Sequence, residues 1–141
     1  MAIVFSDTIS LSTKGLGDTA DITAGVTRIA EAAGAKNGVV AVFAQGSTAS
    51  VTTIEYEPGV VNDLKKTLEK IVPAGAPYEH DRAWGDGNGF SHVRAALMKP
   101  SLTVPLIDGK MALGTWQQIV FIDFDNRPRE RNVIVQVVGV E

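Results

Sequence analysis

The chain has 141 residues, of which 45% are hydrophobic and 21% are charged, a composition typical of folded globular proteins and not of disordered ones. A chain of this length builds one core, so we expect a single domain over residues 1–141. The net charge of -3 gives no general attraction for nucleic acid or anionic lipid, and the lack of cysteine excludes disulfides, thiolate metal sites and cysteine nucleophiles.

The first residues carry neither a basic lead nor a long apolar segment, and no later run reaches the roughly 18 apolar residues of a membrane-spanning helix. We therefore expect a cytoplasmic protein that does not bind membranes. Small molecules and other copies of the chain remain as the expected partners.

The first half of the chain predicts strands that alternate with a helix. Residues 3–12 are rich in β-branched and apolar types and predict a strand, which a glycine-rich turn ends at residues 14–17. Apolar residues between Ile22 and Ala33 recur every three or four positions, which predicts a helix. Residues 39–44 and 50–55 then predict two strands that pair antiparallel through the short link between them.

A second helix is predicted from Pro58 to Pro73, since Leu64, Leu68 and Ile71 form one apolar stripe. After Ser101 the sequence is strand-like, with Asp108-Gly109 as a two-residue hairpin turn. The predicted strands are residues 101–106, 111–113, 117–124 and 132–140. These elements predict an α+β fold, with a mostly antiparallel, β-sandwich-like sheet and two covering helices in a single domain.

Both histidines of the chain lie in the segment 78–92, together with several acids and glycines. Imidazole is the side chain best suited to bind a transition metal or to move a proton near neutral pH. The glycines allow a tight loop that gathers His80, Asp81, Asp86 and His92 at one point. A Gly/Asp/Asn-rich segment is also typical of an ordinary surface turn, so both interpretations stay open at this stage.

Two further acids, Glu55 and Glu57, lie two residues apart where the predicted strand 50–55 ends. Either one can supply an oxygen ligand or a general base. For Glu57 we favour a simpler role, that of an acid complementing the dipole of the helix that starts at Pro58. For Glu55 the two interpretations are balanced.

Small-residue and basic segments offer weaker signals for anion binding. The loops 46–50 and 84–89 present backbone N–H groups and hydroxyls, but neither matches a nucleotide-binding motif. Arg82 and Arg94 flank the histidine segment and can each grip a phosphate or simply face solvent.

The C-terminal half adds a basic run and a tryptophan. Arg127, Arg129 and Arg131 would face one way if extended, although the adjacent turn residues favour an exposed hairpin loop. Trp116 either fills the core, which we favour, or roofs a pocket with Gln117 or Gln118 reaching a ligand.

Seven segments occur in an order and spacing that can be recognised. They read STASVT at 47–52 followed by Glu55, YEHD at 78–81, SHVR at 91–94, PSLTVP at 100–105, DGK at 108–110, LGTWQQ at 113–118 and VQVVG at 135–139. In these segments the chain resembles the YjbQ-like family over nearly its whole length. The resemblance implies a compact α+β fold with a β-sandwich, a homotrimer, and a secondary thiamine-phosphate synthase activity that joins a pyrimidine diphosphate to a thiazole phosphate and releases pyrophosphate.

By this resemblance, His80, His92 and Glu55 match the family's histidines and acid. The chain departs from the family at Gly46 and Phe90, where many members have histidine. A site built on three or four histidines therefore cannot form here. Two imidazoles with a carboxylate can still form an open metal site.

Two functions follow as hypotheses. In the enzyme hypothesis, His80, His92 and Glu55 are catalytic and His80, His92 and Asp86 hold a divalent metal, zinc or magnesium. Phosphate oxygens then contact Ser47, Thr48, Arg94 and Gln117. In the alternative, the chain is a non-catalytic module that binds a phosphorylated metabolite or a metal. We expect a homotrimer under either hypothesis, because a ring of subunits covers sheet edges and apolar faces.

Overall fold

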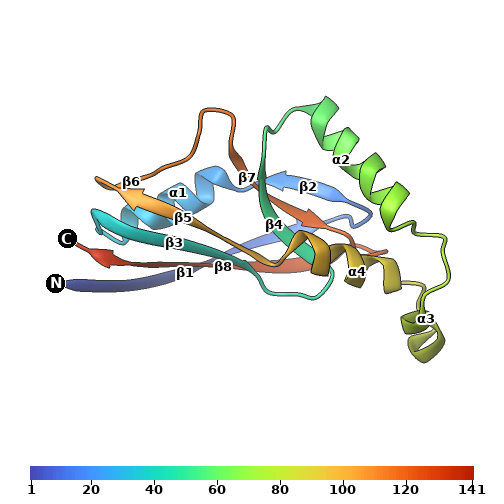
Figure 1. The fold of residues 1–141 in the computed structure, drawn as a ribbon. Coiled ribbons are helices and arrows are strands. Elements are labelled where there is room, and N and C mark those ends of the chain that lie inside the picture. The colour runs from blue at the N-terminus through green and yellow to red at the C-terminus, as the bar shows by residue number, and fades with distance from the viewer.

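The computed structural model describes residues 1–141 as two antiparallel sheets and four helices (Figure 1). The larger sheet has five strands in the order β1-β8-β3-β5-β6, and the smaller has three in the order β2-β7-β4. The five strands are β1 (Ala2–Thr13), β8 (Arg129–Val140), β3 (Asn37–Ala44), β5 (Ser101–Ile107) and β6 (Lys110–Met111). The three strands are β2 (Asp18–Asp21), β7 (Gln118–Asp123) and β4 (Ala49–Ile54).

The main core lies between the inner face of the larger sheet and a layer formed by helix α1 (Thr23–Ala32) and the smaller sheet. Buried and more exposed side chains alternate along β8: Val133, Val135 and Val137 are buried in this core, while their neighbours face outward. From the helix, Val26 and Ile29 complete the same core.

The other face of the smaller sheet is covered by helices α2 (Pro58–Ile71) and α4 (Gly89–Met98), and helix α3 (Glu79–Trp84) lies beyond them at one end of the molecule (Figure 1). Strand β7 is consequently buried on both faces. Phe121 belongs to the main core, whereas Ile122 packs with Leu68 of α2 and Ala95 of α4.

The α+β fold expected from the sequence is confirmed, as are the two helices that periodicity predicted. The Asp108-Gly109 turn is also confirmed: both residues have positive φ, 48° and 79°, and the flanking Ile107 and Lys110 are paired. No helix of the structure combines the length and the apolar character needed to cross a membrane.

Two expectations were wrong. Strands β3 and β4 do not pair with each other, because the chain crosses at residues 45–48 from the larger sheet to the smaller one. The second error concerns the number of helices, since the segment 78–92 forms α3 and the first turn of α4 rather than a loop. Its glycines separate the two helices: Gly85 and Gly87 both have φ of 64°, and α3 ends at the first of them.

The doubly buried strand β7 provides a test of this layering. We predict that Phe121→Ala lowers the free energy of unfolding by about 3–5 kcal/mol, because it opens a cavity between the two sheets. Ile71→Ala, at an exposed position at the end of α2, is the matched control and should cost under about 0.5 kcal/mol. Urea denaturation of both variants measures the difference, and equal losses would contradict the proposed position of Phe121 in the core.

Candidate functional site

The two histidines are brought together by the turn between α3 and α4. His80 lies in the first turn of α3 and His92 in the first turn of α4. Asp81 accepts a hydrogen bond from the backbone N–H of Gly89 at 2.9 Å, which ties the two helix starts to each other. A side chain at Gly89 would lie 2.6 Å from Cβ of Tyr78, so only glycine permits this close approach.

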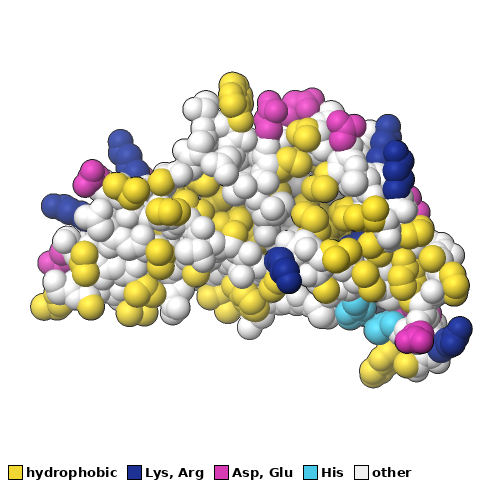
Figure 2. Space-filling model, viewed as in Figure 1, with side chains coloured by type: hydrophobic (Ala, Val, Ile, Leu, Met, Phe, Trp, Pro, Cys, Tyr) yellow, Lys and Arg dark blue, Asp and Glu magenta, His cyan; other side chains and the backbone are white.

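The imidazole rings lie against each other, with centroids 4.4 Å apart and planes tilted by 38°. In Figure 2 the two histidines are neighbours on the surface at the end that carries α3, beside an acidic side chain. Nδ1 of His80 lies 3.8 Å from Oδ1 of Asp81 and 3.6 Å from Oδ1 of Asp86. Both distances exceed a hydrogen bond, so this buried nitrogen has no partner in the chain although two carboxylates face it.

This arrangement suits a small cation. Ligand atoms of His80, Asp81 and Asp86 all lie within 4.8 Å of one another. One imidazole nitrogen with two carboxylates is a donor set that zinc accepts, and the carboxylates alone suit magnesium. His92 was expected among the ligands, but in the structure its ring lies against that of His80 while Asp81 completes the converging set.

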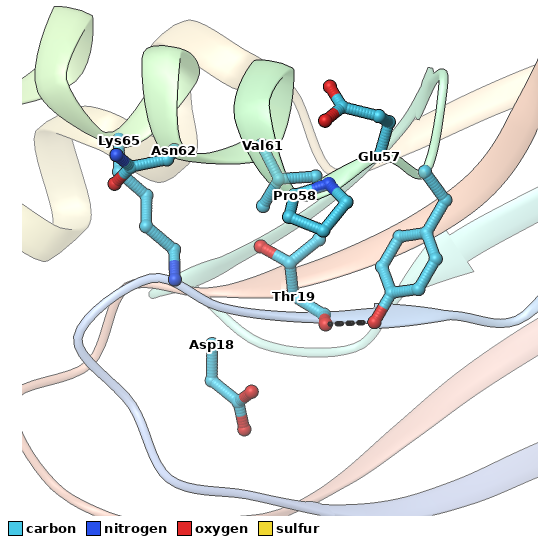
Figure 3. Close-up of a pocket in the computed structure, with 8 residues that line it drawn as sticks. Asp18, Thr19, Glu57, Pro58, Val61, Asn62 and Lys65 are labelled. Atoms are coloured by element: carbon cyan, nitrogen blue, oxygen red, sulfur yellow. Dashed lines mark hydrogen bonds between the residues drawn. The ribbon is translucent and has the colours of Figure 1, made fainter.

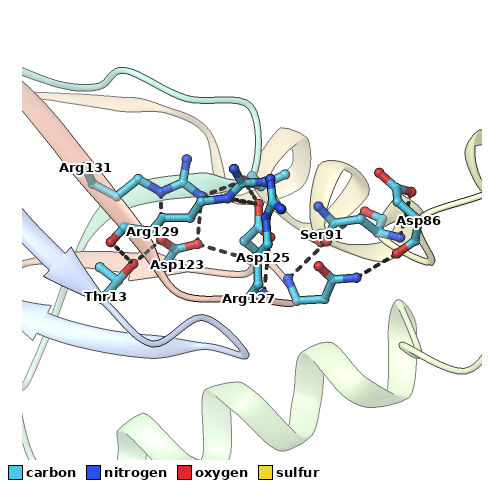
Figure 4. A network of polar contacts seen from close by, with 11 residues as sticks. Thr13, Asp86, Ser91, Asp123, Asp125, Arg127, Arg129 and Arg131 are labelled. Atoms are coloured by element: carbon cyan, nitrogen blue, oxygen red, sulfur yellow. Dashed lines mark hydrogen bonds and ion pairs between the residues drawn. The ribbon is translucent and has the colours of Figure 1, made fainter. Parts of the chain in front are cut away.

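The turn that carries Asp86 is fastened to the end of β7 (Figure 4). The side-chain amide of Asn126 donates to the backbone oxygen of Asp86 at 2.8 Å, and its backbone N–H donates to Oδ1 of Asn88 at 3.1 Å. Ser91 of α4 donates to the backbone oxygen of Asn88 at 3.0 Å. The position of the acid is therefore set by the sheet and by α4 together.

Behind this turn lies a buried group of acids and arginines that the sequence did not reveal. Asp123 accepts two hydrogen bonds from Arg131, at 2.7 and 2.8 Å, and one from Thr13 at 2.5 Å. Asp125 accepts bonds from Thr48 at 2.9 Å and from Arg129 at 3.1 Å. The signal was present in the sequence, because Asp123 interrupts an apolar strand and a buried acid requires a partner.

Asp125 is 1% exposed, and its ionisation reflects its surroundings. Burial alone would raise the pKa of its carboxyl, but hydrogen bonds from Thr48, Arg129 and Asn88 and the charge of Arg129 lower the pKa below its ordinary value. The hairpin-loop interpretation of the basic run was wrong for two of its arginines, since Arg129 and Arg131 both lie in β8 and both are paired with these acids.

A cavity of about 290 Å³ lies beside His92, lined also by Gly46, Ser47, Ala49 and Pro100. Ser47 is exposed there and can contact a ligand, as expected. Thr48 is buried and its hydroxyl is already engaged, because it donates to Asp125 and accepts from Arg131 at 2.6 Å.

Arg94 has a structural role in this structure. Its guanidinium donates to the backbone oxygen of Val72 at 3.0 and 2.8 Å and to Glu69 at 2.6 Å, and it lies 4.9 Å above the ring of Phe90. These contacts hold the end of α2 against α4. The expected contact of Arg94 with phosphate would have to compete with them.

Glu55 and Gln117 lie at the opposite end of β4 from the histidines. Ala49 borders the His92 cavity and Glu55 follows it by six residues, a separation of about 20 Å along a strand. Gln117 accepts from the backbone N–H of Gly114 at 2.8 Å. Trp116 is 70% exposed, so the expectation of a core position was wrong. Trp116 and Glu55 line a second cavity of about 440 Å³.

Next to that cavity, a hollow of about 340 Å³ separates β2 from the start of α2 (Figure 3). Tyr56 donates to the backbone oxygen of Thr19 across it at 3.3 Å. Glu57 accepts from the backbone N–H groups of Gly59 and Val60, at 2.7 and 2.9 Å, and these bonds lower the pKa of its carboxyl. The prediction that Glu57 serves the start of the helix is confirmed.

Comparison with known proteins gives a consistent result. The family model described as "UPF0047 protein YjbQ-like" matches residues 7–140. A UPF0047 protein of Methanothermobacter thermautotrophicus is 39% identical over 136 residues, covering 96% of this chain and 93% of that protein. A crystal structure from Sulfolobus solfataricus, described as a YbjQ-like protein of unknown function, has a TM-score of 0.94 at 29% identity and covers 99% of both chains. One from Clostridium acetobutylicum has a TM-score of 0.84 at 33% identity, covering 93% of this chain and 98% of that one.

The lowered pKa of Asp125 predicts a pH dependence. A carboxyl that ionises more readily in the folded state stabilises the fold above its unfolded pKa, and this contribution is lost as pH falls below about 4 through the lowered folded value. We expect Asp125→Asn to be less stable at neutral pH and to lose less stability on acidification than the unmodified chain. Denaturation midpoints between pH 7 and pH 3 measure this, and parallel pH profiles for the two proteins would contradict it.

Proposed function

Because the chain belongs to the YjbQ-like UPF0047 family, we propose that it is a transferase of the secondary thiamine-phosphate synthase type that acts at the cluster of His80 and His92. The observation that supports this most directly is the Nδ1 atom of His80. It is buried and unpaired, and it faces Asp81 and Asp86 from a distance at which a bound cation fits between them.

In this reaction the ring nitrogen of a thiazole phosphate attacks the methylene carbon of a pyrimidine diphosphate. A carbon–nitrogen bond forms, the carbon–oxygen bond to the diphosphate breaks, and pyrophosphate leaves with the electron pair. A divalent metal, when bound by His80, Asp81 and Asp86, supplies positive charge that stabilises the departing pyrophosphate.

The residues of the chain divide the remaining work. Ser47 borders the cavity beside His92 and can donate a hydrogen bond to a phosphate oxygen. His92 lines that cavity and its ring lies against the ring of His80, so it can hold a proton for an oxygen of the leaving group. Asn126 and Asn88 keep Asp86 in place while the substrate binds.

The second candidate is a module that binds a phosphorylated metabolite or a metal without turnover. One observation favours it: Phe90 is buried beneath Arg94 where many family members have histidine, so this part of the site offers no imidazole. A catalytic assay separates the two candidates.

We predict that His80→Ala and His92→Ala each reduce product formation from a pyrimidine diphosphate and a thiazole phosphate by at least about 100-fold, since each removes a group at the reacting centre. Glu79→Gln is the matched control, because Glu79 is an acid of the same helix outside the converging set, and it should retain activity. Elemental analysis of the same proteins should show bound metal that His80→Ala loses.

Circular dichroism confirms that the variants are folded. Full turnover in both histidine variants would contradict the catalytic role proposed for His80 and His92. Ligand-induced thermal stabilisation without any product would replace the enzyme with the binding module.

We also propose that the active assembly is a homotrimer with sites shared between neighbours. The outer face of the larger sheet has no helix on it. The rows of side chains that run across the centre of this face, from strand to strand, contain no charged residue. Val4, Val138, Val39 and Pro105 are neighbours across four strands in one such row, and Ile134 with Phe43 forms another. In Figure 2, hydrophobic side chains lie along the lower edge of the molecule, where Figure 1 shows β1, β8 and β3. Such a face is typical of a surface covered by another subunit.

A shared site explains the separation found along β4. The histidine cluster lies at one end of the subunit, whereas Glu55, exposed Trp116 and their 440 Å³ cavity lie at the other end. In a closed ring the two ends of successive subunits can meet. The expected roles of Glu55 and Gln117 are then supplied to the neighbour's histidines.

Mixing of inactive variants tests this arrangement. We expect His92→Ala and Glu55→Ala to be inactive alone, and equal amounts of the two, after subunit exchange, to recover about one quarter of the unmodified activity, because one junction in four then combines two intact halves. The control mixes His92→Ala with His80→Ala, which lie on the same half and should give no recovery. Sedimentation measures the assembly, and absence of recovery in an exchanged trimer would place the whole site within one subunit.

A further inference from the structure

We infer that Arg131, beneath the loop at Gly46, is the anion-binding residue of the cavity beside His92 and contacts a phosphate or diphosphate group of the substrate. This inference rests on the proposed function, since it names the part of the substrate that the same site recognises. It assigns to Arg131 the role that the sequence suggested for Arg94.

The first observation is how the guanidinium of Arg131 is held. Its Nε donates to Asp123 at 2.7 Å, and its Nη2 donates to Asp123 at 2.8 Å and to Thr48 at 2.6 Å. The remaining nitrogen, Nη1, forms no hydrogen bond in the chain, and Figure 4 shows it projecting away from the two acids. Nη1 has no partner, yet it is not one of the buried polar atoms, so it keeps some access to solvent. Its two N–H groups therefore remain open to an incoming acceptor.

The second observation is what lies above Nη1. A Cβ atom on Gly46 would lie 2.8 Å from Nη1 and 3.7 Å from Cζ of Arg131, with no other atom of the chain within 4 Å. The lack of a side chain at Gly46 therefore leaves the terminal nitrogen uncovered. Gly46 and Ser47 are both exposed and both line the cavity that reaches His92.

The third observation is the local charge. Arg129 pairs with Asp125, and Arg131 pairs with Asp123 and also lies 3.6 Å from Asp125 through Nη2, so two buried acids face two arginines. The acids are buried, at 1% and 0% exposure, and they fix the guanidinium in one orientation without covering Nη1. A guanidinium pre-positioned in this way loses little side-chain entropy when an oxyanion binds.

These observations favour a phosphate oxygen over a neutral group. Nη1 of Arg131 lies beneath Gly46, the chain neighbour of Ser47, so an oxyanion at this loop can accept from the guanidinium, and a charge-assisted hydrogen bond is about twice as strong as a neutral one. In the proposed reaction this is the position of the diphosphate, with its far end at Arg131 and its leaving oxygen toward His92.

The test is the binding of inorganic pyrophosphate to the full-length protein, measured by calorimetry in the presence of a chelator so that no metal contributes. We expect Gly46→Ala to weaken binding by about 10-fold or more, the loss typical of one hydrogen bond to a charged group, because the new methyl group lies over Nη1. Gly75→Ala is the matched control, since a methyl group there meets no atom within 4 Å, and it should bind within about twofold of the unmodified chain.

Arg131→Lys is the second variant, in case the alanine disturbs the loop. It keeps the positive charge beside Asp123 but lacks a second terminal nitrogen, so it should remain folded and lose affinity to a similar extent. Melting temperatures of all variants confirm folding.

The outcomes separate this inference from the proposed function. Equal pyrophosphate affinity in Gly46→Ala or in folded Arg131→Lys overturns the role of Arg131, as does a lack of binding to the unmodified chain at millimolar pyrophosphate. Normal pyrophosphate binding without any turnover leaves the anion site in place and overturns the transferase.

Discussion

The structure depends on the buried pairing of Asp123 and Asp125 with Arg131 and Arg129. An acid with 0% exposure, such as Asp123, is tolerated only when hydrogen bonds replace its lost water, and removing one partner of such a pair typically costs about 3–5 kcal/mol. Here the partners come from different elements, since Thr13 ends β1 and the arginines lie in β8. The pairing therefore joins the end of the smaller sheet to the larger sheet where the chain crosses between them.

The same pairing positions the candidate site on both of its sides. Through Thr48 it fixes the loop that carries Gly46 and Ser47, and through Asn126 it fixes the turn that carries Asp86. The histidine cluster and the loop of Gly46 and Ser47 are thus held in place by contacts with the two sheets. A site held in this way keeps its ligand groups within the narrow geometry that metal binding and catalysis require.

The sequence predicted the elements whose periodicity is undisturbed, such as the strand that became β8 and the stripe of α2, and it predicted the meeting of His80 with His92. It did not predict α3 and α4, because glycines that end one helix and start the next dominate the segment 78–92. Hydrogen-bond partners that lie far apart in the sequence could not be predicted either. Thr13 and Asp123 are 110 residues apart, and nothing in the local pattern of either indicates the other.

The division of the candidate groups between two ends of the subunit gives the fold a further consequence. Under the proposed shared site, the histidine cluster lies about 20 Å along β4 from Glu55 of the same subunit, and each isolated subunit lacks a full set of reacting groups. In the proposed trimer, the apolar centre of this sheet face drives ring closure, so assembly and site formation become one equilibrium, and ligands that bind the closed site also stabilise the ring. In this proposed assembly the covered face and the split site follow from the same constraint, because subunits that associate to bury apolar surface can place a site at each junction at no additional cost in fold stability.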